Sequence, residues 1–250
     1  MHHSESTANI SVLSVPLQIG LTGSIGMGKS TVDKHLRVIG IPVFDADEVV
    51  HNLYRTGGAA VELIQNLYPE VIKEGAVCRK ELSEKIMQNP SVLSDIEKIV
   101  HPLVTAKRNE FIESAKQRGE LLVVHDIPLL FETKQAGNFD YIMVVSANAD
   151  TQRRRVLSRS GMTEEKFAAI LKKQVPDEEK RRLADFVILT DFDGFEEAKA
   201  QVSQSLEKII LTHHAARWEQ WKNRRGIQSR VKYSNVTAVN NMLLMQFRLF

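Results

Sequence analysis

A glycine-rich turn between an apolar run and a helical run constrains the fold more than any other part of the sequence. Residues 23–30 read Gly-Ser-Ile-Gly-Met-Gly-Lys-Ser and fit the pattern G-x-x-x-x-G-K-[ST]. Residues 18–22 are apolar enough for a buried parallel strand, and residues 30–38 have helical spacing. Glycines in such a turn let the backbone bend tightly and approach a ligand without an intervening Cβ atom. The strand–turn–helix context favours a phosphate-binding loop over a chance match to the pattern.

The backbone N–H groups of this loop, with the N-terminus of the following helix, would form a cradle for phosphate oxygens. In loops of this pattern the lysine reaches the β- and γ-phosphates, and the hydroxyl residue after it binds Mg²⁺. Here these residues are Lys29 and Ser30. The chain is therefore predicted to bind a nucleoside triphosphate together with Mg²⁺. The predicted nucleotide-binding residues are Gly23, Ser24, Ile25, Gly26, Met27, Gly28, Lys29, Ser30 and Thr31.

Further apolar runs predict the remaining strands of a parallel sheet. They lie at residues 41–44, 121–125, 141–145 and 186–189, and their nearly continuous apolar character is typical of strands buried on both faces. A strand, a helix and a second strand in succession predict a right-handed parallel crossover. The predicted fold is α/β, with the three-layer α/β/α arrangement of P-loop NTPases and a five-stranded parallel sheet.

Two helical excursions interrupt this order of strands. The first lies between the second and third predicted strands and covers about 75 residues, too many for a simple crossover. It shows helical periodicity and no convincing strand, so we interpret it as an inserted helical subdomain. Its predicted helices span residues 49–54, 59–68, 79–87 and 92–115. The second excursion, residues 150–183, is rich in Arg and Lys, and a closing helix is predicted from residue 195 to about residue 213.

Length and charge limit what such a chain can be. At 250 residues, one α/β domain with inserted subdomains is the expected size, with two small domains as the alternative. The 33 basic and 31 acidic residues give a net charge of +2, so no overall field attracts nucleic acid and no nucleic-acid partner is expected. Cys78 is the single cysteine, which fits a reducing compartment. The sequence shows no signal peptide and no membrane-spanning run, and we expect a cytoplasmic or organelle-matrix location.

Carboxylates follow two of the predicted strands at the sheet edge that carries the glycine-rich loop. Asp45 and Asp47 end the second strand, where alternation along a strand would place both on the same side. One of them could orient an attacking hydroxyl and accept its proton, while the other helps hold Mg²⁺ or caps the next helix. The alternative, stronger for Asp45, is a pair that only caps the helix. Asp126 ends the third strand and is predicted to support Mg²⁺, whereas His125 is expected to pack at the strand end.

A cluster of arginines follows the fourth predicted strand. Arg155 and Arg159 are four residues apart and would share one face of a helix. A guanidinium aimed at the γ-phosphate stabilises the charge of the transition state, and Arg159 is the residue we predict for that role. Arg153 and Arg154 are expected on a solvated face. A Ser-Gly pair follows directly, as expected at the joint of a lid that closes over bound nucleotide.

Beyond these motifs, the sequence resembles the dephospho-CoA kinase family. The resemblance implies ATP-dependent phosphorylation of the ribose 3′-hydroxyl of dephospho-CoA, which gives CoA and ADP in the last step of coenzyme A biosynthesis. It covers roughly residues 17–210, in the family's order and spacing. The matching stretches are residues 19–23, Asp45-Ala46-Asp47, His101-Pro102-Leu103, residues 127–132, Thr151-Gln152 with the following Arg155 and Arg159, and residues 184–188.

The same resemblance implies roles for individual positions. Asp47 corresponds to the catalytic base. The implied catalytic residues are Thr22, Lys29, Asp47 and Arg159. The implied contacts to the acceptor are Asp47, His101, Pro128 and Leu129. The kinase core would span residues 16–212, with an acceptor-binding insertion at about 50–118 and a lid at about 159–183.

Two positions depart from the family's pattern. Lys180, with Arg181 beside it, stands where an arginine is common in the lid. A lysine offers a point charge and not a bidentate fork, so the lid geometry does not carry over there. Residues 189–191 read Leu-Thr-Asp where the family often has Asn, so contacts to the nucleotide base are not assigned in that loop.

Residues 213–250 form a basic, Trp-containing extension of the predicted core. Residues 217–232 contain six Lys or Arg and one Glu, and Trp218 and Trp221 lie among them. Cations beside interfacial tryptophans could contact a membrane surface. The favoured alternative is that the two tryptophans pack back onto the core.

Two alternatives to this assignment stay open at the level of the sequence. One is a kinase for another small hydroxyl or monophosphate acceptor. The other is a nucleotide-binding regulatory or scaffold protein that lacks turnover. Asp47, Arg159 and Ser30 together disfavour the second alternative, because binding alone needs neither a base nor a transition-state arginine.

Overall fold

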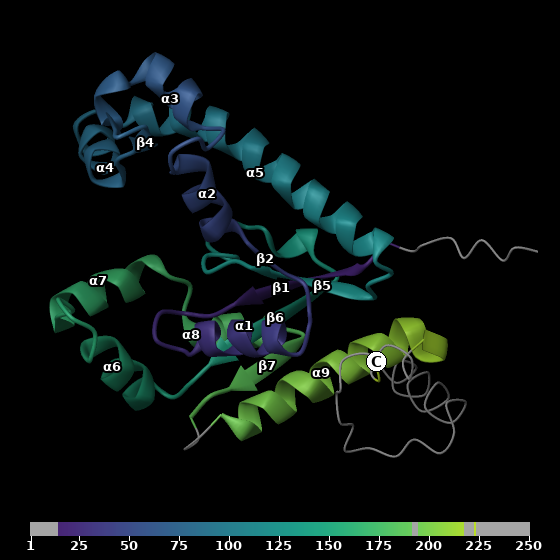
Figure 1. Cartoon of the computed structure of the whole chain (residues 1–250). Helices are drawn as coiled ribbons and strands as arrows, with labels where there is room; N and C mark the ends of the chain where they lie inside the picture. Colours follow the sequence, from purple (N-terminus) through teal and green to yellow (C-terminus); the bar gives the residue numbers. More distant parts are fainter. Residues whose placement is uncertain (1–14, 192–194, 218–222, 224–250) are drawn as a thin grey trace, which may run out of the picture.

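The computed structural model describes residues 15–191, 195–217 and 223 of the chain. Its centre is a parallel sheet in the strand order β2–β5–β1–β6–β7 (Figure 1). The strands are β1 (Leu17–Thr22), β2 (Val43–Asp45), β5 (Leu122–Asp126), β6 (Tyr141–Ser146) and β7 (Phe186–Leu189). All the predicted strands are present and close to their predicted positions, which confirms the α/β fold and the five-stranded parallel sheet.

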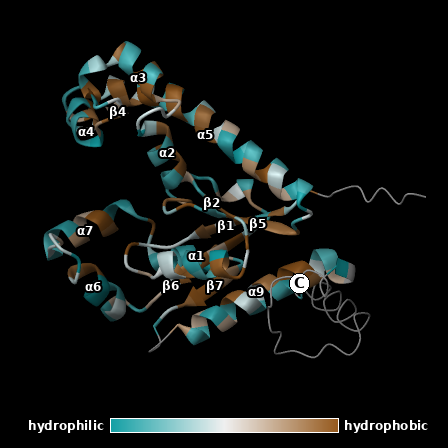
Figure 2. Cartoon of the chain, viewed as in Figure 1, coloured by the Kyte–Doolittle hydropathy of each residue, from teal (hydrophilic) through white to brown (hydrophobic). Residues whose placement is uncertain are grey.

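Helices and loops cover both faces of this sheet. On one face, α1 and α9 bury apolar side chains such as Leu36 and Leu206 together with side chains of β1 and β5. On the other face lie Phe111 of α5, which contacts Phe44, and the fully buried Leu130 of the segment after β5. The central strands are mostly hydrophobic, while hydrophobic and hydrophilic residues alternate along the helices (Figure 2). The main helices are α1 (Lys29–Val38), α2 (Ala46–Tyr54), α3 (Val61–Leu67), α4 (Arg79–Gln88), α5 (Ser91–Gln117), α6 (Ala149–Leu157), α7 (Glu164–Lys173), α8 (Asp177–Arg182) and α9 (Glu196–His214).

The helices between β2 and β5 have a small hydrophobic core of their own. Buried residues of this core include Leu53, Ile64, Leu82 and Ile96, and the unit projects from the carboxyl edge of the sheet (Figure 1). A short antiparallel hairpin, β3 (Ile72–Lys73) and β4 (Ala76–Val77), lies among these helices. The prediction that this stretch holds no strand is therefore wrong. Strands of two residues are too short to produce a recognisable alternation of apolar and polar side chains.

The end of α9 packs against the amino ends of the strands. The hydroxyl of Tyr141, at the start of β6, lies 2.7 Å from Nε2 of His213. Beyond the helix, Nη2 of Arg217 donates to the carbonyl oxygen of Gly119, at 3.1 Å. Trp218 and Trp221, on which the membrane and core-packing alternatives depend, lie outside the described residues. Within the part of the chain that the structure describes, no helix is long and apolar enough to cross a membrane.

His125 is a buried packing residue, as predicted. Its ring contacts Phe44, Phe111 and Phe139, and its Nε2 lies 2.6 Å from Oε1 of Gln18. Burial lowers the pKa of His125 to about 4, and the positive charge of Arg108 acts in the same direction. The imidazole is therefore neutral at physiological pH. It is also buried and does not line the cavity described below, so it cannot reach a substrate.

The buried histidine predicts a specific loss of stability in mild acid. An unfolded chain binds a proton at His125 below about pH 6.5, whereas the folded chain resists protonation until about pH 4. The free energy of unfolding should therefore fall as the pH falls through this window, by about 3 kcal/mol for this residue. Denaturant unfolding at pH 7 and pH 4.5 would measure it, with His125→Gln as the control that cannot titrate. Parallel pH profiles for the two proteins would contradict the prediction.

Candidate active site

The glycine-rich loop between β1 and α1 adopts a backbone that requires glycine. Gly26 and Gly28 have φ values of 78° and 92°, in the left-handed region that side chains disfavour. A Cβ atom on Gly23 would lie 2.6 Å from the carbonyl oxygen of Val145. Gly28 precedes the first turn of α1, and Thr31 N–H donates to its carbonyl oxygen at 3.0 Å. The loop thus turns directly into a helix N-terminus, which is a favourable place for anions.

An open cavity of about 790 Å³ lies over this loop. A volume of this size is within the range of ligand sites in proteins. Every residue predicted from the loop pattern, residues 23–31, lines the cavity. Pro128, Arg155 and Arg159 also line it, together with four residues that the sequence left unassigned. These four residues are Ile170, Gln174, Thr190 and Phe195.

Thr190 and Arg155 support the loop from beneath. The Thr190 hydroxyl donates to the carbonyl oxygen of Met27 at 2.8 Å. The Arg155 guanidinium donates to Thr190 Oγ1 at 2.9 Å and to its carbonyl oxygen at 2.6 Å. Gly28 has no room for a side chain here, because its Cβ would lie 3.0 Å from Thr190 Oγ1. Thr190 is thus both a support of the loop and a part of the cavity wall.

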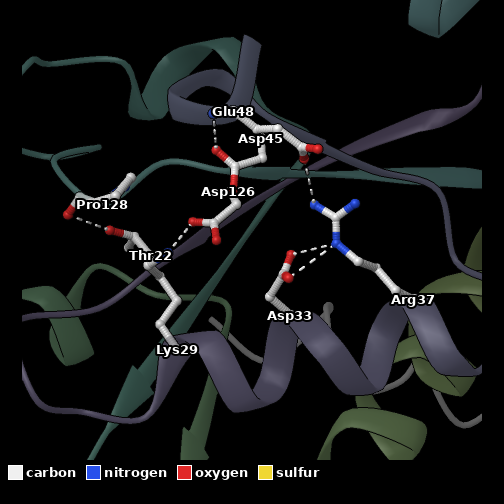
Figure 3. Close-up of polar contacts among 8 residues, drawn as sticks. All are labelled: Thr22, Lys29, Asp33, Arg37, Asp45, Glu48, Asp126 and Pro128. Carbon is white, nitrogen blue, oxygen red and sulfur yellow. Dashed lines mark hydrogen bonds and ion pairs between the residues drawn. The ribbon is translucent and has the colours of Figure 1, made fainter. Parts of the chain in front are cut away.

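Lys29 and Asp126 form a partly buried ion pair at the carboxyl edge of the sheet (Figure 3). The carboxylate comes from the end of β5 and the ammonium from the first residue of α1. Burial raises the pKa of the Asp126 carboxyl, and the ammonium of Lys29 opposes that shift. The same view shows Thr22, which is fully buried at the end of β1, donating to the carbonyl oxygen of Pro128 at 3.2 Å.

Asp45 and Asp47 are separated by a boundary between strand and helix. Asp45 is the N-cap of α2, and its Oδ1 accepts a hydrogen bond from Glu48 N–H at 3.0 Å (Figure 3). Asp47 lies in the first turn of α2 and is exposed. The two residues therefore do not alternate along one strand. The prediction that strand alternation places both side chains on the same side is wrong. The capping alternative is confirmed for Asp45, and Asp47 is left with a free carboxylate at the same sheet edge as the loop.

Two of the arginines after β6 line the cavity, and the helix that carries most of them ends before Arg159. α6 ends at Leu157, so Arg159 lies in the turn that follows and does not share a helical face with Arg155. Both arginines nevertheless line the cavity. Arg153 is exposed and pairs with Glu164 at the start of α7. Arg159 is exposed and stays free to approach a ligand.

Five of the predicted site residues do not line this cavity: Thr22, Asp47, His101, Asp126 and Leu129. His101 is exposed on α5, and Leu129 is 44% exposed in the segment after β5. Asp47, near the start of α2, is exposed to solvent. Lys180, by contrast, is fully buried and does not line the cavity.

The donor set fits a magnesium ion held mainly by phosphate oxygens. In the described parts of the chain, no cluster of three or more His, Cys, Asp or Glu side chains could hold a metal by itself. Mg²⁺ commonly takes one or two protein oxygens and completes its shell with water and substrate phosphates. The Ser30 hydroxyl lines the cavity, and the Asp126 carboxylate stands behind Lys29. These are the two protein groups that would hold the ion.

A phosphate loop that leads from the first strand into a helix, faced by arginines from a separate helical segment, is the arrangement of P-loop kinases. A family model described as dephospho-CoA kinase matches residues 17–194. The dephospho-CoA kinase of Mesorhizobium japonicum is 49% identical over 191 residues, which cover 76% of this chain and 95% of the relative. That of Rhizobium meliloti is 50% identical over 191 residues, covering 76% and 97%. The chain therefore belongs to the dephospho-CoA kinase family.

Solved structures share the fold of this chain. A Thermus thermophilus protein of known structure superposes with a TM-score of 0.64 at 34% identity, covering 77% of this chain and 97% of that one. Dephospho-CoA kinase from Campylobacter jejuni superposes with a TM-score of 0.55 at 21% identity, which supports the shared fold. As a kinase of this family, the chain uses ATP, and the cavity over the loop is where a nucleotide would bind.

Proposed function

We propose that this chain transfers the γ-phosphoryl group of ATP to the ribose 3′-hydroxyl of dephospho-CoA, giving CoA and ADP. The observation that carries this conclusion is the match to the dephospho-CoA kinase family over residues 17–194, which includes the whole phosphate-binding loop. The cavity supports it, because its walls combine that loop with Arg155 and Arg159. A protein that only bound nucleotide would not need a transition-state arginine, the role we assign to Arg159.

In the proposed reaction the acceptor oxygen forms a bond to the γ-phosphorus while the bond to the ADP oxygen breaks. We assign Asp47 to orient the acceptor hydroxyl and to take its proton, which then passes to solvent. A carboxylate is a weak base, but the transition state is loose and proton removal comes late. Alignment of the hydroxyl is therefore the main contribution of the carboxylate. Its exposed position at the carboxyl edge of the sheet supports this role.

Charge on the transferred group would be balanced by side chains around the loop. Lys29 is placed to approach the β- and γ-phosphates once it leaves Asp126, and Arg159 approaches from the lid side. Thr22 holds the carbonyl of Pro128 beside the cavity. Bound Mg²⁺, held by Ser30 and Asp126, would add further charge neutralisation.

We further propose that the helical insertion, about residues 50–118, binds the acceptor and that residues 159–183 act as a lid. The insertion has its own core and projects at the edge of the sheet that bears the loop (Figure 1). His101 on α5, with Pro128 and Leu129 after β5, are the residues that we assign to the acceptor. A separate core lets the insertion keep its shape while the cavity opens and closes.

An acceptor panel tests the proposed function. ADP release from MgATP would be measured with dephospho-CoA, AMP, adenosine, shikimate or water as the acceptor. We expect strong turnover with dephospho-CoA alone. Turnover with a different acceptor would support kinase activity but contradict dephospho-CoA as the substrate. ATP binding without turnover on any acceptor would favour a regulatory protein.

A further inference from the structure

The tip of the phosphate-binding loop is held by two glutamines from the helical segment after β6. The Ile25 N–H donates to Gln174 Oε1 at 3.1 Å. On its other side, the Ile25 carbonyl oxygen accepts a hydrogen bond from Gln152 Nε2 at 2.8 Å. Gln152 belongs to α6, and Gln174 follows the last residue of α7. One residue of the loop is thus fixed from both sides by the segment that we assign in part to the lid.

The position of Gln174 is set in turn by a carboxylate from the segment after β5. The Val175 N–H donates to Glu132 Oε1 at 2.9 Å, and Lys180 Nζ lies 2.8 Å from the same oxygen. The Lys180 side chain is fully buried and that of Glu132 is 12% exposed. Burial would raise the pKa of the Glu132 carboxyl, but the hydrogen bonds from Lys180 and from backbone groups outweigh burial and lower it. A charged, buried pair of this kind is costly to break, so it anchors residues 174–175 firmly.

Glu132 lies on the same short segment as the predicted acceptor contacts. Residues 128–134 form consecutive turns. Thr133 N–H donates to the carbonyl oxygen of Leu129 and Gln135 N–H to that of Leu130, both at 3.0 Å. Leu130 is fully buried and fixes this segment to the sheet. Pro128, at its start, lines the cavity. A continuous series of contacts therefore leads from the Pro128 segment through Glu132 and Gln174 to Ile25.

We propose that Glu132 and Gln174 are positioning residues that couple acceptor binding to nucleotide binding. The inference rests on the proposed function, which places the acceptor beside Pro128. An acceptor that stabilises this segment also stabilises the position of residues 174–175, and thereby the conformation of Ile25 in the loop. Nucleotide affinity rises when the acceptor is bound, and linkage requires that the nucleotide raises acceptor affinity by the same factor.

Binding measurements on the full chain test the coupling. The affinity of the nonhydrolysable nucleotide AMP-PNP, with Mg²⁺, would be measured calorimetrically without and with saturating dephospho-CoA. We expect the Kd ratio of the wild-type protein to be at least about five, the lower end of common couplings. Gln174→Ala should bring the ratio close to one. Lys173→Ala, which alters the exposed neighbouring residue, should keep the wild-type ratio.

A second variant guards against a simple folding defect. Glu132→Ala combined with Lys180→Met removes both buried charges, so neither is left unpaired, and it also removes the acceptor for Val175 N–H. This protein should likewise show a ratio close to one, with thermal melting as the check that it is folded. A role in stability alone would lower the melting temperature and leave the ratio unchanged, which would overturn the proposal. So would a wild-type ratio of one.

A measurement of turnover distinguishes a failure of the coupling from a failure of the proposed function. If the wild-type protein phosphorylates dephospho-CoA but shows no coupling, only the coupling is wrong. If it fails to phosphorylate dephospho-CoA, the proposed function itself fails.

Discussion

The Asp47→Asn protein is expected to have a kcat about 10²- to 10⁴-fold below that of the wild type, the usual contribution of a positioned acid or base. Asparagine keeps the size of the side chain but cannot take the proton of the acceptor hydroxyl. Nucleotide affinity should be unchanged, because Asp47 lies on α2, away from the walls of the cavity. Steady-state assays with dephospho-CoA, combined with nucleotide titrations, would measure both quantities.

The neighbouring carboxylates provide matched controls for that experiment. Glu48 is exposed and lies in the same helical turn, so Glu48→Gln should leave kcat close to its wild-type value. Asp45→Ala removes the N-cap of α2 and should cost about 1 kcal/mol of stability. Near-normal turnover by Asp47→Asn would remove Asp47 from the catalytic role.

Lys29→Ala is expected to lower kcat/KM by about 10²- to 10³-fold, as for other single groups that stabilise transition-state charge. The structure adds a complication, because this change leaves the buried Asp126 carboxylate without its partner. Part of any loss of stability would come from that unpaired charge, since breaking a buried ion pair is itself destabilising.

A double variant separates the two effects of removing Lys29. Lys29→Ala with Asp126→Asn leaves no unpaired charge, so its melting temperature should recover toward that of the wild type while its activity should not. Initial rates over a range of ATP concentrations and thermal melting curves would provide the comparison. Unchanged kcat/KM in Lys29→Ala would refute the role assigned to the phosphate loop.

The sequence predicted the parts of the fold that depend on local pattern. The loop at residues 23–30 joins specific glycines, a strand and a helix within one short stretch, so its conformation follows from local chemistry. The five strands were found for a similar reason, since strands buried on both faces are nearly continuous apolar runs. Helix boundaries were less accurate. α2 begins at Ala46, and this changed the relation between Asp45 and Asp47 from strand neighbours to a cap and a helical residue.

The contacts that complete the site could not be predicted from local pattern. Gln152 and Gln174 are separated from Ile25 by 127 and 149 residues, and a glutamine in or just after a polar helix carries no signal of such a partner. The family resemblance assigns no contact to Thr190, although its hydroxyl supports the loop. Lys180 lies at a lid position where the sequence leads one to expect a cation facing the cavity, but its burial against Glu132 keeps it out of the cavity. Each of these outcomes depends on tertiary packing.

The attachment of Arg217 to Gly119 has a practical consequence for handling the enzyme. Gly119 precedes β5, so this contact lies at the amino ends of the strands, whereas the phosphate loop leaves β1 at the carboxyl ends (Figure 1). A bead or a sensor surface attached at residue 217 itself would therefore be tethered on the side of the sheet remote from the cavity. Substrates would then enter from the opposite side, so residue 217 is a suitable attachment point for flow assays.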